Sequence, residues 1–315
     1  MIDAVVVRRH DEAEGICSFE LAAADGSALP PFEPGAHIDV QPLDGLVRQY
    51  SLCPAPQGHY LIGVLREPAS RGGSAAMHVL APGQRLRIGM PRNQFPLVAG
   101  ARRSLLFAGG IGITPLLAMA EHLAAQGADF ALHYCVRSAG RAAFANRIRG
   151  GPIAAYGSFH FDDGSAEQRL DLDAVLGAPE EGTHVYVCGP SGFMDWVLAG
   201  ARQRGWPEAQ VHKEYFAAPA AVAIDGDQAF EVQLGRSGVV VQVPVGRTVV
   251  EVLAEHGVEV PVSCEQGVCG TCLTRVLDGI PEHRDVYLTD AEKAVNDCFT
   301  PCCSRSRSAR LVLDL

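Results

Sequence analysis

The chain has 315 residues, enough for two or three domains that each bury a core. Hydrophobic residues make up 48% and charged residues 20% of it, which is typical of a soluble globular protein. The formal net charge of -10 argues against a nucleic-acid partner and against a basic membrane-binding surface. No basic segment followed by an apolar run opens the chain, and no apolar run is long enough to span a bilayer. We therefore expect a cytoplasmic protein.

The first hundred residues contain short strand patterns separated by turn signals such as Asp25-Gly26 and Pro82-Gly83. One short helix is expected near residues 74–80. This succession predicts an antiparallel β-barrel over residues 1–100. The expected strands are Ala4–Arg9, Cys17–Ala22, His37–Val40, Arg48–Leu52, Tyr60–Leu65 and Arg85–Met90.

Two stretches of the predicted barrel suit a cofactor that carries a phosphate and a ring. In Arg48-Gln49-Tyr50-Ser51, strand alternation sends the first and third side chains to one face and the other two to the opposite face. An arginine suits bidentate phosphate binding, and a tyrosine can stack on a ring. Arg71-Gly72-Gly73-Ser74 adds backbone N–H groups and a hydroxyl at an expected helix start. Each stretch alone could be ordinary surface, but together they suggest a flavin phosphate pocket.

From about residue 101 the pattern changes to strands that alternate with helices. Such alternation predicts a doubly wound parallel sheet over residues 101–223, with its ligand crevice at the carboxyl ends of the strands. The expected strands are Ser104–Phe107, Phe130–Val136, Ser158–Phe161, Thr183–Cys188 and Val211–Phe216. The expected helices cover residues 116–123, 142–148, 171–176 and 194–201.

Two motifs follow strands of this predicted sheet. The first is Gly109-Gly110-Ile111-Gly112-Ile113-Thr114-Pro115, in which Thr114 is expected to be the helix N-cap. A strand, a glycine turn and a helix start can hold a pyrophosphate, although the spacing is not G-x-G-x-x-G. The turn could also merely pack a helix against a strand. The second motif is Cys188-Gly189-Pro190, in which Cys188 could equally be a buried structural cysteine.

A linker over Ala217–Ala223 is expected to precede a third domain at residues 224–315. Strand patterns cover residues 229–234, 239–243, 274–277 and 310–315. Helical patterns cover residues 248–256, with Thr248 as the N-cap, and 289–293. A domain of mixed α+β composition is therefore expected.

The cysteines of this third domain carry the strongest signal in the chain. Cys264, Cys269 and Cys272 have the spacing C-x4-C-x2-C, and Cys302 follows thirty residues later. This is the plant-type ligand spacing of a [2Fe–2S] cluster, in which each tetrahedral iron takes two thiolates and two bridging sulfides. Zinc is the alternative, but zinc sites usually have paired C-x2-C knuckles, and disulfides are disfavoured in the cytosol.

Two glycines lie inside this cysteine stretch. Gly267 and Gly270 suit a tight loop whose backbone N–H groups point at the cluster sulfurs. We expect a Cβ at either position to be in the way of the cluster.

All these motifs, together with His212-Lys213-Glu214-Tyr215-Phe216, occur in one characteristic order. Over essentially its whole length the chain resembles the phthalate dioxygenase reductase family, which includes vanillate O-demethylase reductases. The resemblance implies a flavin-binding β-barrel, an NAD-binding α/β domain and a plant-type ferredoxin domain of the β-grasp type. It favours Cys302 as the fourth cluster ligand and leaves Cys298 and Cys303 as bystanders.

The resemblance also implies roles for individual residues. FMN is implied rather than FAD, with its phosphate and ring near the two barrel motifs. The nicotinamide nucleotide is implied at the two motifs of the parallel sheet. The residues expected around the two cofactors are Arg48, Gln49, Tyr50, Ser51, Arg71, Gly72, Gly73, Ser74, Gly109, Gly110, Gly112, Thr114, Arg137, Cys188, Gly189, Pro190 and Phe216. Those expected nearest the reacting atoms are Ser51, Thr114, Cys188, Glu214 and Phe216.

One stretch departs from the expected pattern. Residues 137–141, Arg-Ser-Ala-Gly-Arg, follow the second strand of the sheet, where an acidic residue would accept the ribose 2′-OH of NADH. Arginines there could instead accept the 2′-phosphate of NADPH. Because the family uses NADH, we predict NADH and keep NADPH as the alternative.

The expected activity is the transfer of a hydride from NADH to FMN, followed by single-electron transfer through the [2Fe–2S] cluster. The family implies a Rieske-type oxygenase as the electron acceptor, in a system for aromatic hydroxylation or O-demethylation. We expect a monomer. Two alternatives remain: a reductase that serves a cytochrome P450 or another acceptor, and a non-enzymatic metal-binding or redox-sensing module.

Overall fold

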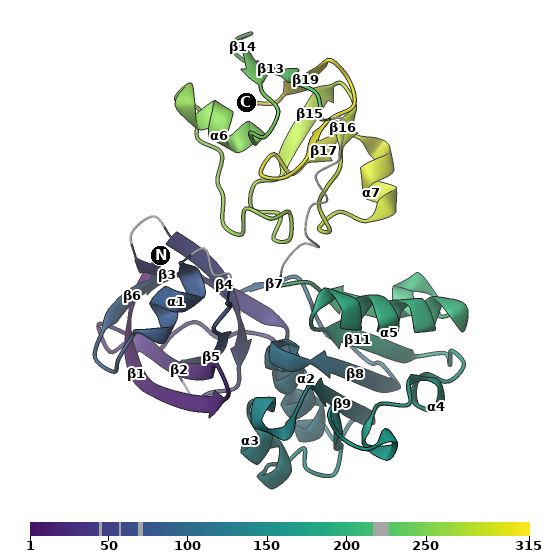
Figure 1. Cartoon of the computed structure of the whole chain (residues 1–315). Coiled ribbons are helices and arrows are strands. Elements are labelled where there is room, and N and C mark those ends of the chain that lie inside the picture. The colour runs from purple at the N-terminus through teal and green to yellow at the C-terminus, as the bar shows by residue number, and fades with distance from the viewer. Residues whose placement is uncertain (44–45, 57, 69–71, 217–226) are drawn as a thin grey trace. The chain divides into compact units, whose positions relative to one another are not determined.

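The structure is a computed structural model that describes residues 1–43, 46–56, 58–68, 72–216 and 227–315. The chain divides into two compact units, Met1–Glu214 and Tyr215–Leu315. The first unit holds a barrel and a parallel sheet, and the second holds a mixed sheet (Figure 1). The predicted linker and the predicted boundary at residue 223 lie outside the described residues, so the three domain limits stay predictions.

The first unit begins with the predicted antiparallel barrel. Its strands pair in the order β4-β5-β2-β1-β6-β3-β7, and an additional pairing of β3 with β4 closes the barrel. Apolar side chains such as Phe19, Leu21 and Ile38 are fully buried inside it. The strands are β1 (Ile2–Ala13), β2 (Ile16–Ala23), β3 (Ala36–Leu43), β4 (Leu46–Cys53), β5 (Tyr60–Leu65), β6 (Arg85–Ile88) and β7 (Arg92–Asn93), with α1 (Gly73–His78) between β5 and β6.

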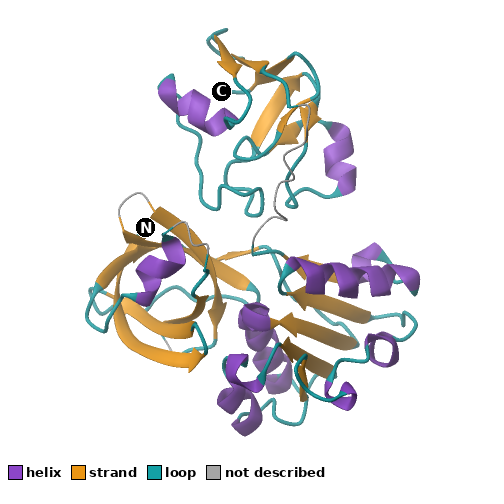
Figure 2. Ribbon diagram, viewed as in Figure 1, coloured by secondary structure: helices purple, strands orange, loops and turns teal. Residues whose placement is uncertain are grey.

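The second half of this unit is the predicted doubly wound sheet. All its strands are parallel, in the order β10-β9-β8-β11-β12. Figure 2 shows helices on both sides of it. The strands are β8 (Arg103–Gly109), β9 (Phe130–Val136), β10 (Gly157–Phe161), β11 (Thr183–Cys188) and β12 (Val211–Glu214). The helices are α2 (Ile113–Ala125), α3 (Ala145–Gly150), α4 (Leu172–Leu176) and α5 (Ser191–Gln203).

Helix α2 begins differently from the prediction. The predicted N-cap, Thr114, is the second residue of the helix, and Gly112 holds the cap position without a side-chain hydrogen bond. The Thr114 hydroxyl donates to the Ile111 carbonyl at 3.0 Å. The prediction was wrong because a 3₁₀ turn over Gly110–Gly112 leads directly into the helix, so the backbone is already helical before Thr114.

The second unit is the predicted α+β domain. Its sheet has the order β14-β13-β19-β15-β17, with β13 and β19 parallel. Helix α6 starts at a capping box in which Thr248 and Glu251 bond each other's backbone N–H groups, as its sequence indicates. The elements are β13 (Phe230–Leu234), β14 (Val240–Val243), α6 (Val249–Glu255), β15 (Thr274–Asp278), β16 (Pro281–Glu282), α7 (Asp290–Val295), β17 (Cys298–Phe299), β18 (Arg305–Ser306) and β19 (Arg310–Leu313).

The short strands β7, β16, β17 and β18 have two residues each and were not predicted, because two residues carry no alternation pattern. Over the described ranges, the helices are too short or too polar to cross a lipid bilayer.

Candidate cofactor and cluster sites

The four predicted cluster cysteines come together in the second unit. The Cys302 thiol lies beside those of Cys264 and Cys272, and the Cys264 thiol lies beside that of Cys269. Cys269, Cys272 and Cys302 are buried. The ten cysteines all lie in the described part of the chain and form no disulfide there, so the four thiols are available to bind a cluster.

The cysteine loop, residues 264–272, directs backbone N–H groups at its own sulfur atoms. Gln266 and Val268 each donate to Cys264 Sγ at 3.4 Å, and Thr271 donates to Cys269 Sγ at 3.5 Å. Hydrogen bonds of this kind stabilise the negative charge of cluster-bound thiolates. The loop geometry therefore fits a [2Fe–2S] cluster.

The glycines of the cysteine loop have a different neighbour from the one predicted. Both Gly267 and Gly270 have positive φ, at 71° and 66°. A Cβ on Gly267 would collide with Cys303 Sγ and lie 2.9 Å from Cα of Asp285, and a Cβ on Gly270 would enter the Tyr287 ring. The contact that excludes a side chain here is therefore with protein atoms that pack on the loop.

Cys303 lies beside Cys302 in space as well as in sequence, because the two thiols are hydrogen-bond neighbours. Its Sγ lies 3.3 Å from the Thr300 hydroxyl and is half-buried. Among the described residues, no three His, Cys, Asp or Glu side chains surround one point that a single metal ion could occupy. A [2Fe–2S] cluster does not need such a group, because each of its irons takes only two thiolates.

The two barrel motifs lie against each other. The Arg48 side chain packs on Gly73, where a Cβ would lie 2.6 Å from Arg48 Cγ, so only glycine leaves room for the arginine. Gln49 instead donates to Asp39 Oδ1 at 3.2 Å. Ser74 Oγ accepts the backbone N–H of Glu67 at 3.1 Å. Of the predicted cofactor residues, Arg71 lies outside the described part of the chain; Gly72 precedes α1 with a φ of 96°.

A buried polar cluster joins the barrel to the parallel sheet. Ser51 is 4% exposed and hydrogen-bonds the Glu214 carboxyl. His37, which was not predicted, pairs with Ser51 across β3 and β4, and its Nδ1 lies 4.0 Å from Glu214 Oε1. Within the described residues, His37 Nε2 and Glu214 Oε2 have no hydrogen-bond partner. Two unsatisfied buried polar atoms fit a polar cofactor edge at this junction.

The charges of this cluster are set by burial. Burial raises the pKa of Glu214 to about 8, so the carboxyl keeps its proton at neutral pH. Burial, together with the nearby Arg92 cation, lowers the pKa of His37 to about 4. Burial also raises the pKa of Tyr50 well above its ordinary value. At pH 7 the side chains of Glu214, His37 and Tyr50 are therefore all uncharged.

This assignment predicts the pH dependence of stability. The folded-state pKa of Glu214 is raised from 4.5 to about 8, so its contribution to stability is complete below pH 4.5 and is lost as the pH rises through 8. The lowered pKa of His37 has the opposite effect, because its contribution to stability is present above pH 6.5 and is lost as the pH falls through 4. From pH 6.5 to 8 we expect the titration of Glu214 to lower the free energy of unfolding by about 2 kcal/mol.

Urea unfolding of Glu214→Gln should not show this fall, because the amide does not titrate. Glu208→Gln, at an exposed glutamate, should show the same fall in the free energy of unfolding between pH 6.5 and 8 as the wild type. If the free energy of unfolding of Glu214→Gln depended on pH as that of the wild type does, the assignment of a protonated Glu214 carboxyl would be contradicted.

The two motifs of the parallel sheet meet at the carboxyl ends of β8 and β11, where the strand order reverses. A Cβ on Gly112 would collide with the Cys188 carbonyl, and a Cβ on Gly189 would lie 2.9 Å from Gly109 Cα. Gly110, with a φ of 52°, faces open space. A crevice at such a reversal is the usual nucleotide position in this fold. Three of these four glycines thus allow close packing, and Gly110 leaves its backbone accessible.

Thr114 and Cys188 lie where the barrel, α2 and β11 meet. The Cys53 thiol donates to the Thr114 carbonyl at 3.5 Å, and a Cβ on Gly63 would lie 2.8 Å from Thr114 Cγ2. Cys188 is fully buried, and burial raises the pKa of its thiol well above the ordinary value. A neutral buried thiol is a poor nucleophile, which favours a role of Cys188 in shaping the site. Pro190 follows at the N-cap of α5.

A cavity of about 430 Å³ opens at the carboxyl ends of β9 and β10 beside the start of α5. Its volume is within the usual range of small-molecule sites. The predicted Arg137 is exposed at the end of β9, close to this cavity in sequence but not part of its lining. The lining residues are Cys135, His160, Asp162, Arg169, Leu170, Gly192, Phe193 and Trp196.

Phe216 belongs to the second compact unit and is 41% exposed. The strand predicted to reach it, β12, ends at Glu214. Its expected position beside a flavin ring stays a prediction.

Comparison with known proteins identifies the architecture. Residues 232–307 match the family model of the 2Fe-2S iron-sulfur cluster binding domain. A vanillate O-demethylase oxidoreductase of Pseudomonas putida is 60% identical, with 100% of both chains covered. The solved structure of a phthalate dioxygenase reductase is 37% identical and has a TM-score of 0.76, with 100% of this chain and 98% of that chain covered.

A third similarity is to a larger protein. The structure of an intact type IV self-sufficient cytochrome P450 monooxygenase has a TM-score of 0.87 and 35% identity, and it matches 100% of this chain with 41% of its own. The relatives that match over the full length are oxidoreductases, which excludes the non-enzymatic alternative. The chain therefore belongs to the phthalate dioxygenase reductase family and is an oxidoreductase with a 2Fe-2S iron–sulfur domain.

Proposed function

We propose that this protein takes a hydride from NADH onto FMN and passes the electrons one at a time through a [2Fe–2S] cluster to a Rieske-type oxygenase. The observation that carries the proposal is the convergence of the Cys264, Cys269, Cys272 and Cys302 thiols in a chain that also holds a barrel and a nucleotide-type sheet. When bound, the flavin supplies the chemistry by which a two-electron donor can reduce a one-electron acceptor.

The protein's own residues have positioning roles in this proposal. Arg48, held over Gly73, binds the flavin phosphate, and Tyr50 packs against the ring. Ser51 and His37 hold the protonated Glu214 carboxyl at the barrel–sheet junction. A phosphate site made by one arginine and a short glycine turn supports FMN, which has one phosphate. Heat release of the flavin, followed by chromatography, distinguishes FMN from FAD.

The choice of NADH is supported by the third strand of the sheet. The Asp162 N–H donates to the Val136 carbonyl at 3.1 Å, which brings the end of β10 against the end of β9. The Asp162 side chain lines the cavity. A carboxylate there can accept a hydrogen bond from a ribose 2′-OH and repels a 2′-phosphate. In this proposal, Asp162, directly after β10, supplies the acidic residue that is missing after β9.

We expect Asp162→Ser to shift the preference toward NADPH. The Asp162 carboxylate and the 2′-phosphate of NADPH are both negative and repel each other. Removing the carboxylate should therefore lower the ratio of kcat/KM for NADH to that for NADPH by about ten- to a hundredfold. The control is Asp163→Ser, at an adjacent acid that is not part of the cavity lining. Steady-state reduction of ferricyanide with each nucleotide measures the ratio. Equal effects of the two substitutions would contradict the assignment.

The proposed acceptor is the Rieske-type oxygenase of an aromatic O-demethylation or hydroxylation system. This is supported by the relatives named for vanillate O-demethylase and phthalate dioxygenase systems. The similarity to a self-sufficient P450 favours a P450 as the second candidate. The test mixes the purified protein and NADH with a purified Rieske-type oxygenase or a P450. Faster reduction of the Rieske centre supports the proposal, and faster reduction of the P450 heme overturns it.

We further infer that the protein works as a monomer in the cytoplasm. Ten cysteines that form no disulfide among the described residues suit a reducing compartment. Sedimentation of the purified protein tests the oligomeric state.

A further inference from the structure

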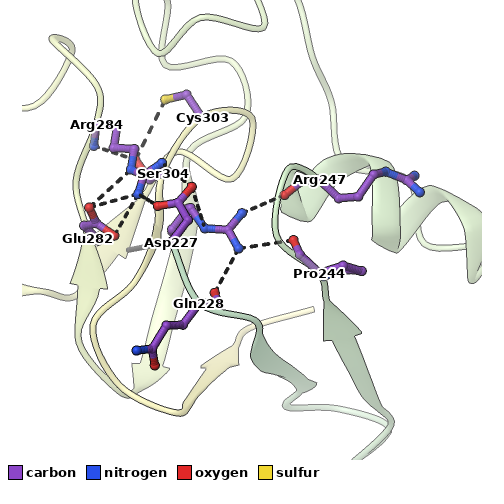
Figure 3. A network of polar contacts seen from close by, with 9 residues as sticks. Asp227, Gln228, Pro244, Arg247, Glu282, Arg284, Cys303 and Ser304 are labelled. Carbon is purple, nitrogen blue, oxygen red and sulfur yellow. Dashed lines mark hydrogen bonds and ion pairs between the residues drawn. The ribbon is translucent and has the colours of Figure 1, made fainter. Parts of the chain in front are cut away.

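Asp285 lies between the two stretches of chain that carry the cluster cysteines. Its side chain is 0% exposed. On one side, the backbone N–H of Val286 donates to the Gly267 carbonyl in the cysteine loop at 3.0 Å. On the other side, the backbone N–H of Arg284 donates at 3.1 Å to the hydroxyl of Ser304, two residues after the fourth cysteine; Figure 3 shows these two residues together. Asp285 is therefore held against both halves of the ligand set.

No side chain separates Asp285 from the cysteine loop at the point of contact. A Cβ placed on Gly267 would lie 2.9 Å from both Cα and Cβ of Asp285. Gly267 stands between Cys264 and Cys269 in the sequence. The backbone of Asp285 is therefore packed on the cysteine loop. Its buried carboxyl acts electrostatically on the thiol of Cys303, which lies beside Cys302, and charges interact strongly there because little water screens them.

The groups around the Asp285 carboxyl compensate its charge only in part. Oδ2 accepts the backbone N–H of Leu288 at 2.8 Å. The Lys293 ammonium lies 4.0 Å from Oδ2 and donates to the Asp285 carbonyl at 2.7 Å. His283 Nδ1 lies 3.6 Å from Oδ1, which has no hydrogen-bond partner among the described residues. One N–H donor and one ammonium group face this carboxyl, and neither bonds Oδ1.

Given the [2Fe–2S] cluster of the proposed function, on which this step rests, we propose that Asp285 lowers the reduction potential of the cluster and that Lys293 raises it. Reduction adds one electron to the cluster. A fixed negative charge nearby disfavours that electron, and a fixed positive charge favours it. The pair would thus set how readily the cluster accepts electrons from the flavin and gives them to the acceptor.

The test is a redox titration of the full-length protein, followed by absorbance and by electron paramagnetic resonance of the reduced cluster. Asp285→Asn keeps the shape and the acceptor for the Leu288 N–H but removes the charge. At a fixed solution potential we expect its ratio of reduced to oxidised cluster to rise about tenfold, a shift of about 59 mV for one electron. Lys293→Gln should shift the potential in the negative direction.

The control is Asp278→Asn, which removes an exposed carboxylate of the same domain and should change the potential little because water screens it. Iron content and the oxidised spectrum verify that each variant holds its cluster. Unchanged potentials in cluster-loaded Asp285→Asn would overturn the inference. If Asp285→Asn does not hold a cluster, the absence of a negative shift in Lys293→Gln overturns it. A wild-type protein without a cluster would refute the proposed function itself.

Discussion

Replacing Cys302 by serine should abolish the [2Fe–2S] cluster while leaving the flavin in place. The Cys302 thiol lies beside those of Cys264 and Cys272, so its loss leaves the cysteine loop without the distant fourth ligand. The variant should lose the iron–sulfur absorbance and its reduced paramagnetic signal. It should still reduce ferricyanide with NADH, because that dye accepts electrons from the flavin, but it should no longer reduce a protein acceptor.

Cys303→Ser is the matched control, because it makes the same chemical change one residue away. Cys303 Sγ lies 3.3 Å from the Thr300 hydroxyl, a contact that a serine hydroxyl can keep. This variant should retain iron, spectrum and electron transfer. A cluster that survives in Cys302→Ser and disappears in Cys303→Ser would assign the fourth ligand to Cys303.

Replacing Arg305 by methionine should strongly destabilise the iron–sulfur domain. The guanidinium is 6% exposed and donates to the carbonyls of Arg247, Gln228 and Pro244 at 2.8, 3.0 and 3.2 Å. Figure 3 shows these three carbonyls as part of one polar network with Asp227. Methionine fills part of the volume but leaves all three carbonyls without their donor. We expect a loss of about 3–5 kcal/mol.

For a domain of this size, that loss lowers the midpoint of thermal unfolding by roughly 10–30 °C. Visible circular dichroism of the cluster measures it. Arg310→Met is the control, because Arg310 pairs with Glu231 at 2.6 Å on the surface and its side chain is 47% exposed. An exposed pair of this kind contributes about 0–1 kcal/mol. Equal losses in the two variants would show that the buried carbonyl contacts do not stabilise the domain.

Features that depend on local spacing could be predicted from the sequence. The cysteine loop is defined by intervals of a few residues, and the strands β5, β9 and β11 follow apolar or alternating runs. The capping box at Thr248 is likewise a local pattern. Each of these signals is complete within about ten residues, so no knowledge of the tertiary packing is needed to interpret it.

Features that depend on tertiary packing could not be predicted. His37 sits in an ordinary strand pattern, and only the closing of the barrel against β12 brings it to Glu214. Asp285 lies thirteen residues beyond Cys272 and reaches the cysteine loop through backbone hydrogen bonds that have no sequence signature. Thr114 was misassigned because threonine before proline suits an N-cap, whereas the 3₁₀ turn had already started the helix.

The most direct test of the proposed electron path is an anaerobic absorbance spectrum of the purified protein, before and after addition of NADPH and then NADH. We predict flavin bands on a broad iron–sulfur envelope, with slow bleaching by NADPH and rapid bleaching of both chromophores by NADH. A colourless protein, or a coloured one that neither nucleotide bleaches, would contradict the path from nicotinamide through flavin to the cluster.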